Sequence, residues 1–181
     1  MDENIRTILS VTIPAIVAII GFVVTYFLNK RNFYEELRKQ KINIQLDKIS
    51  DVPYEILSLL NTVNDKNISE KKKIESYNNL LAKIVAYGSK EAIVIAAAMQ
   101  EFLYISSQQK SSVSPDGYNT IAYNALLLCQ VKYDLTGIKV NPEYWYRLKF
   151  MEYSTLKQTY RAPVNKIVDE LGLDKFLRIE S

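Results

Sequence analysis

The chain has 181 residues, a formal net charge of +3, one cysteine and no histidine. The lack of histidine excludes Ser-His-Asp and Cys-His catalytic groups, HExxH zinc sites and histidine-dependent acid–base catalysis. One cysteine cannot form an internal disulfide, which fits a reducing compartment. No GxxxxGKS/T or GxGxxG phosphate-binding loop occurs among the five glycines. We therefore expect no cofactor, no metal site and no enzymatic activity, although a metal site made of Asp and Glu alone and an active site built on a carboxylate pair stay open.

An uncharged, apolar segment runs from Ile8 to Leu28 and is followed at once by Lys30 and Arg31. As a helix its 21 residues would span roughly 30 Å, the thickness of the hydrocarbon core of a bilayer. A buried helix of a soluble protein is usually shorter and has polar interruptions. A cleaved signal peptide would have a basic n-region and a small-residue cleavage site, and neither is present. The segment is therefore predicted to be a transmembrane helix over residues 8–28.

The charges on either side of this segment predict its orientation. Arg6 is the one cation before the segment, whereas several follow within a few turns: Lys30, Arg31, Arg38, Lys39 and Lys41. Because positive charge stays on the cytoplasmic side, residues 1–7 should lie outside the cell membrane. A basic juxtamembrane helix over 29–51 and a cytoplasmic domain over 52–181 would follow. The five cations are also candidates for contact with anionic lipid headgroups.

Beyond the anchor, proline, glycine and capping residues divide the chain into helices. Predicted helices start at residues 32, 53, 70, 90 and 115, at Pro142 after Asn141, and at Pro163. Residues 64–67 are expected to form a loop, and residues 106–114 a low-complexity linker. The apolar helix after Ser89, with three consecutive alanines at 96–98, is predicted to be the central core helix. This pattern predicts an all-α fold, with one N-terminal transmembrane helix followed by a multi-helix bundle.

Two side chains on the predicted helix over 115–135 are of interest. Cys129 lies in an apolar run and is expected to pack in the core, because free cysteines are among the most buried residues. Asp134 lies near the end of the helix, where the helix dipole disfavours a carboxylate. It should therefore be held by a cation, such as Lys132, Arg147 or Lys149, or by the N-terminus of a neighbouring helix. Asp134 is predicted to be a structural carboxylate, with a functional role as the alternative.

Aromatic and basic residues alternate between residues 139 and 161. This pattern fits an aromatic helix packed on a bundle with its cations reaching to solvent. It also fits a surface that docks on a protein partner or on lipid headgroups, and nucleic acid is the least favoured partner. The candidate partner-docking residues are Tyr144, Trp145, Arg147, Lys149, Tyr153, Tyr160 and Arg161.

The runs Tyr87-Gly88-Ser89-Lys90 and Lys132-Tyr133-Asp134-Leu135-Thr136-Gly137 belong to a stretch that resembles uncharacterised, mainly Gram-positive bacterial proteins. Those proteins have an N-terminal membrane anchor and a cytoplasmic helical domain. The resemblance covers about residues 75–150 together with the anchor. It implies no activity and assigns no functional residues. A role in phage exclusion or defence is suggested by the resemblance alone.

The sequence favours a membrane-tethered, non-enzymatic protein-interaction module. Its expected partners are the lipid bilayer and a protein, and homo-oligomers stay open. Gly21 and Thr25 form a small-xxx-small pair of the kind that lets membrane helices pack closely. The alternatives are a self-assembling membrane effector and, less favoured, a membrane-tethered nucleic-acid binder.

Overall fold

A computed structural model describes the backbone of residues 3–62, 67–108 and 116–180, and the side chains of residues 16–61, 67–107 and 117–180. The chain is all-α, as predicted, and contains no strand within these ranges. It divides into two compact units, Met1–Ile44 and Gln45–Ser181. Residues 64–66 of the loop expected over 64–67 and the expected helix start at Ser114-Pro115 lie outside the described residues.

The first unit consists of the helix α1 (Glu3–Ile49) up to Ile44. Helix α1 passes without a break from the apolar segment into the basic one, and it is long and apolar enough to cross a membrane. Its described apolar side chains between residues 16 and 28 are exposed. Tyr26 and Phe27 form one edge-to-face aromatic pair and Phe33 and Tyr34 another. Aromatic residues at this position are typical of the membrane–water interface.

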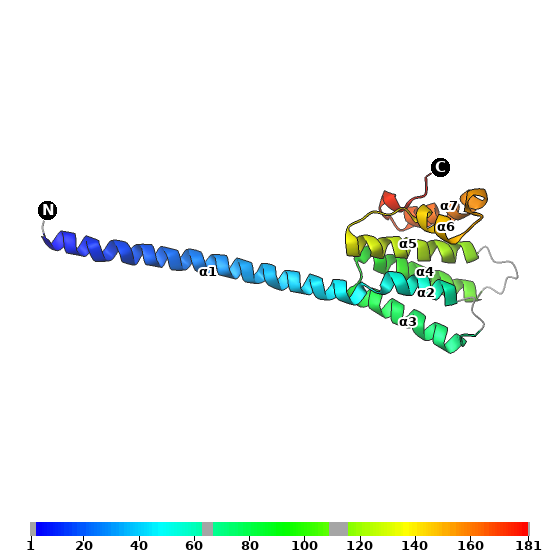
Figure 1. Cartoon of the computed structure of the whole chain (residues 1–181), viewed down its shortest axis with the longest axis horizontal. Helices are drawn as coiled ribbons and strands as arrows, with labels where there is room; N and C mark the ends of the chain where they lie inside the picture. Colours follow the sequence, from blue (N-terminus) through cyan, green and yellow to red (C-terminus); the bar gives the residue numbers. More distant parts are fainter. Residues whose placement is uncertain (1–2, 63–66, 109–115, 181) are drawn as a thin grey trace. The chain divides into compact units, whose positions relative to one another are not determined.

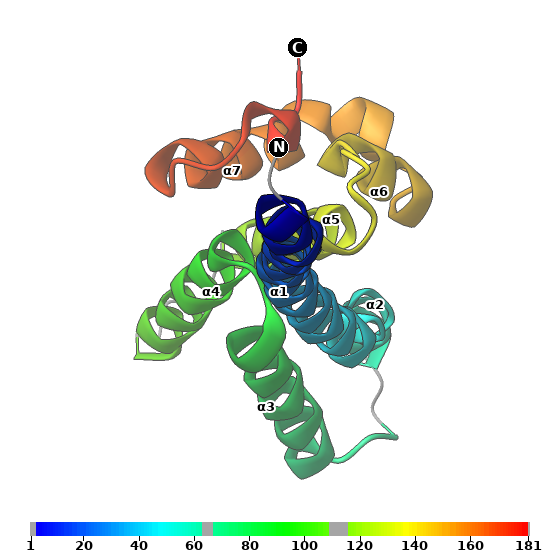
Figure 2. The ribbon, with the colours of Figure 1, turned by 90° about the vertical axis from the view of Figure 1, so that its left-hand side faces the viewer.

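The second unit is a helical bundle arranged around one central helix, α5 (Asp116–Thr136). Figure 2 shows α5 between α2, α3 and α4 on one side and α6 and α7 on the other. A short 3-10 helix, η1, packs against α5 and α7 near the C-terminus. The bounds of these elements, labelled in Figure 1, are α2 (Val52–Thr62), α3 (Glu70–Tyr87), α4 (Lys90–Gln108), α6 (Pro142–Lys149), α7 (Tyr153–Glu170) and η1 (Lys175–Leu177).

The central helix is α5, which corrects the prediction that the alanine-rich helix α4 holds this place. Every residue from 122 to 130 is buried, so α5 is covered on all sides. Helix α4 buries one face only, through Ala92, Ile95, Ala96 and Met99. Its other face is exposed, because α4 packs mainly on α3 and α5 and lies at the edge of the bundle. Residues 106–108, which were expected to belong to the linker, form the end of α4.

Two further predictions about helix ends differ from the structure. The aromatic helix that starts at Pro142 ends at Lys149, and α7 begins at Tyr153 rather than at Pro163. Pro163 therefore lies inside α7, which has a kink at Leu156 (φ −103°, ψ 15°). Tyr153 and Tyr160 lie two turns apart on the buried side of α7. Their burial holds the first half of α7 on the bundle, although proline removes a hydrogen bond within the second half.

Candidate functional site

The structure separates the predicted docking residues into a buried group and an exposed group. Trp145, Tyr153 and Tyr160 are 8%, 4% and 6% exposed and belong to the hydrophobic core. Their rings pack on Tyr146 and Phe150, with ring centroids 4.9 to 6.1 Å apart. These aromatic side chains hold α6 and α7 on the bundle, so a docking surface on this conformation cannot include them.

Burial also sets the ionisation of this aromatic cluster. It raises the pKa of Tyr153 to about 12, with a smaller contribution from the nearby Glu143 carboxylate. Burial likewise raises the pKa of Tyr146 and of Tyr160. All three phenols are therefore neutral at physiological pH and act as packing groups.

Arg161, another predicted docking residue, is used within the bundle. Its Nε donates a hydrogen bond to the carbonyl oxygen of Ile179 at 3.0 Å. Asn165 also donates to this carbonyl and accepts from the Ile179 N–H, at 3.0 and 2.9 Å. Asn141, the N-cap of α6, donates to the carbonyl of Arg178 at 2.6 Å. These bonds fix the C-terminal segment against α6 and α7, so Arg161 contributes to structure.

The exposed docking residues gather where α6 ends and the chain turns into α7. Leu148 is 89% exposed and Met151 is fully exposed, although both are apolar. Arg147 and Lys149 flank them, and Tyr144 is exposed one turn earlier on α6. We call Arg147, Leu148, Lys149 and Met151 the α6–α7 tip. Sequence analysis missed Leu148 and Met151, because nothing in the local pattern distinguishes them from core residues.

The two cations of the α6–α7 tip have different electrostatic surroundings. Arg147 forms an ion pair with Glu143 at 2.8 Å, and Glu143 is shared with Lys157 at 3.4 Å. Lys149 donates a hydrogen bond to the Asn61 side-chain oxygen at the end of α2, and among the side chains that the structure describes no carboxylate pairs with it. The α6–α7 tip is therefore an apolar projection with positive charge beside it.

Asp134, the predicted structural carboxylate, joins two helices. It accepts hydrogen bonds from Ser89 Oγ at 2.6 Å and from Gln130 Nε2 at 2.8 Å. Ser89 Oγ also accepts the backbone N–H of Ala92 at 3.1 Å and so caps the first turn of α4. Asp134 thus lies at the N-terminus of a neighbouring helix, one of the two arrangements expected from its position. Arg147 and Lys149, which were considered as its partners, bind Glu143 and Asn61 instead.

The predicted lipid-contacting cations all lie on α1. Arg31 forms an exposed ion pair with Glu35 at 3.1 Å. The side chains of the whole set are exposed: Lys30, Arg31, Arg38, Lys39 and Lys41. Their exposure is compatible with contact to lipid headgroups.

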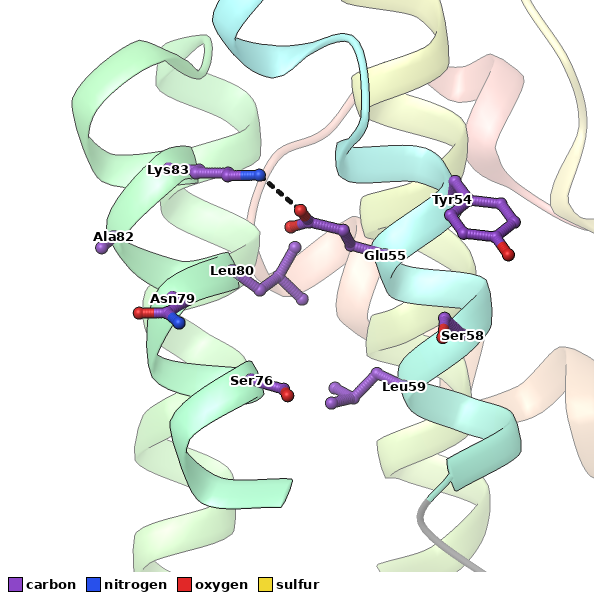
Figure 3. A pocket seen from close by; sticks show the side chains of 9 residues that line it. All are labelled: Tyr54, Glu55, Ser58, Leu59, Ser76, Asn79, Leu80, Ala82 and Lys83. Carbon is purple, nitrogen blue, oxygen red and sulfur yellow. Dashed lines mark hydrogen bonds and ion pairs between the residues drawn. The ribbon is translucent and has the colours of Figure 1, made fainter. Parts of the chain in front are cut away.

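An open groove of about 540 Å³ lies between α2 and α3 (Figure 3). Glu55 of α2 and Lys83 of α3 point toward each other across it and form an ion pair. The rest of the lining is mixed: Ser58, Ser76 and Asn79 are polar, and Tyr54, Leu59, Leu80 and Ala82 are largely apolar. Because the two charges neutralise each other, the pair mainly ties α2 to α3, and a half-exposed pair of this kind stabilises a protein by about 1 kcal/mol at most.

Within the described side chains, no three histidine, cysteine, aspartate or glutamate residues are close enough to hold a metal ion. Cys129 is free and buried in the core, as expected, and burial raises its pKa to about 12. No family model, curated protein or solved structure matches this chain. The candidate site therefore rests on the geometry of the chain itself.

Proposed function

We propose that this protein is a membrane-tethered, non-enzymatic interaction module and that the α6–α7 tip docks on a protein partner. The observation that carries the proposal is the exposure of Leu148 and Met151. Exposing two neighbouring apolar side chains loses the free energy that their burial would provide, about 1.5–3 kcal/mol each. A partner that covers them would recover that free energy, and apolar side chains within a charged rim are typical of protein interfaces.

The charges of the tip indicate the chemistry of the partner. Arg147 and Lys149 favour a surface in which an apolar pocket is bordered by acidic side chains. The contact between Lys149 and Asn61 places the tip beside the end of α2. Residues 45–49, through which the chain enters the bundle, lie instead at the start of α2. Within the second unit, the tip therefore lies at the opposite end of α2 from residues 45–49.

The tether in this proposal is the segment 8–28 of α1, in the cell membrane with residues 1–7 outside and the bundle in the cytoplasm. The cations after the segment support this orientation. A tether raises the effective concentration of the bundle near other membrane-associated proteins, so a contact of modest affinity is sufficient.

Site-specific photo-crosslinking in cells tests the proposal with the full-length protein. A photoreactive phenylalanine analogue replaces Leu148 or Met151, and a matched control replaces Tyr104, which is 65% exposed on α4. We expect adducts with one other protein from positions 148 and 151 and none from position 104. A second variant, Leu148→Ser, should remove the adduct at position 151, because it weakens a hot spot of the interface.

The same experiment distinguishes the second candidate, a self-assembling membrane effector. Gly21 favours this candidate, because it is exposed on α1 and small residues let membrane helices approach closely. Adducts between copies of the chain alone, lost when residues 8–28 are exchanged for an unrelated anchor, would support the effector. That result would refute docking through the α6–α7 tip.

A further inference from the structure

A second cavity, of about 470 Å³ and partly open to solvent, lies between α2, α3, α4, α5 and α6. This volume is within the range of small-molecule sites in proteins. Most of its wall is apolar. The apolar side chains that form it include Leu59, Leu60, Met99, Leu103, Ile121 and Phe150.

Two polar side chains in the wall carry an unpaired atom. Asn124 is 5% exposed, and its Nδ2 donates a hydrogen bond to the carbonyl of Thr120 at 2.8 Å. Its Oδ1 is buried and has no hydrogen-bond partner within the described residues, and the same is true of the Tyr77 hydroxyl. Both residues line the cavity. A buried polar atom without a partner costs about 1–3 kcal/mol, so two such atoms beside one cavity call for an explanation.

The chemistry of the two atoms limits what could pair with them. Asn124 Oδ1 only accepts hydrogen bonds, so its partner must carry a donor. The Tyr77 hydroxyl both donates and accepts, and burial raises its pKa to about 12, which keeps it neutral. A carboxylate or phosphate oxygen only accepts hydrogen bonds and therefore cannot pair with Asn124 Oδ1. A hydroxyl group, which donates and accepts, matches both atoms.

We propose that this cavity binds a neutral, largely apolar molecule that carries a hydroxyl group. The hydroxyl donates to Asn124 Oδ1 and pairs with the Tyr77 hydroxyl, and the apolar body lies against the leucine, isoleucine and methionine side chains. Asn124 Oδ1 and the Tyr77 hydroxyl are closed to water. The hydroxyl of the molecule therefore reaches them after a small shift of the lining side chains. Burial of its apolar body provides the free energy for this shift. The cavity shares one lining residue, Lys149, with the α6–α7 tip, but binding in it does not depend on the proposed docking.

Trp145, the only tryptophan of the chain, lines the cavity and reports on binding. Full-length protein is reconstituted in phosphatidylcholine vesicles, and para-bromophenol is added, because bromine in contact with an indole quenches its fluorescence. We expect saturable quenching of Trp145. Para-bromoanisole, which has the same body without the donor, should bind about tenfold more weakly, the factor expected for one lost hydrogen bond.

The matched variants are Asn124→Leu, which removes the acceptor at similar size, and Tyr77→Phe. Each should weaken the binding of para-bromophenol by about tenfold and leave that of para-bromoanisole unchanged. Circular dichroism checks folding, and Tyr77→Phe gives the answer alone if Asn124→Leu does not fold. A long-chain bromoalkanol placed in the vesicles tests the source of the ligand. Quenching by the bromoalkanol would mean that the hydroxyl compound enters from the lipid phase, and quenching by the phenol alone would mean that it enters from water. Equal binding of the two bromobenzenes, or quenching that never saturates, would overturn the proposal.

Discussion

The hydrogen bonds of Asp134 lead to a quantitative prediction about the stability of the bundle. Asp134→Ala removes the acceptor for Ser89 Oγ and for Gln130 Nε2, which lie at 2.6 and 2.8 Å from the carboxylate oxygens. Gln130 is 3% exposed, so its amide cannot turn to water and loses its partner entirely. Ser89 is only half-buried, so water can replace part of what its hydroxyl loses.

The magnitude follows from the cost of unpaired buried groups. Each costs about 1–3 kcal/mol, and the Ser89 hydroxyl should fall at the lower end. We therefore expect Asp134→Ala to lower the free energy of unfolding by about 2–4 kcal/mol. The matched control is Asp169→Ala, which removes a carboxylate that forms an exposed ion pair with Arg178. Exposed pairs contribute at most about 1 kcal/mol, so the control should change stability little.

Urea unfolding of the full-length protein in detergent micelles measures both variants. Trp145 is the only tryptophan and is 8% exposed within the bundle, so its fluorescence reports on unfolding of the bundle. If Asp134→Ala costs no more than Asp169→Ala, the contact between Asp134 and the start of α4 does not stabilise the protein. The reasoning about this carboxylate would then be wrong.

Three further predictions concern other parts of the bundle. Gly88→Ala should destabilise the protein by about 1–3 kcal/mol in the same urea assay, because a Cβ atom there would lie 2.5 Å from the carbonyl oxygen of Ile84. Unchanged stability would mean that this close approach is easily relieved. Stability should be full below pH 10, the ordinary pKa of tyrosine, and should fall as the pH rises toward 12, since Tyr77 and Tyr153 stay protonated in the folded state and ionise on unfolding. Tyrosinate absorbance recorded with Trp145 fluorescence checks this, and ionisation of all tyrosines near pH 10 without unfolding would contradict it. Cys129 should react with thiol reagents at neutral pH only as fast as the bundle unfolds, because it is buried and its pKa is raised to about 12. Rapid labelling in the absence of urea would contradict this and show that the core opens locally.

Local patterns predicted the elements of this fold and several of their contacts. The helix ends marked by proline after the capping residue at Asn141-Pro142 and by glycine at 88 and 137 are close to where the structure has them. The uncharged apolar segment lies within α1, which continues beyond it in both directions. Capping acts between residues that are neighbours in sequence, so the sequence alone is sufficient to show it. The burial of Cys129 was predictable for a similar reason, because it follows from the apolar character of its own helix.

The tertiary structure decided which helix is central and which side chains remain exposed. Helices α4 and α5 are both apolar, and only the packing of α2, α6 and α7 on α5 makes it the central one. Leu148 and Trp145 lie on the same short helix, yet Leu148 is exposed and Trp145 is buried, because α7 and α5 cover one side of α6 only. The cavity beside Asn124 likewise arises where five helices meet without filling the space between them. Which residues of a helix become buried depends on the segments that pack on it, and these are distant in sequence. The periodicity of one helix therefore cannot predict it.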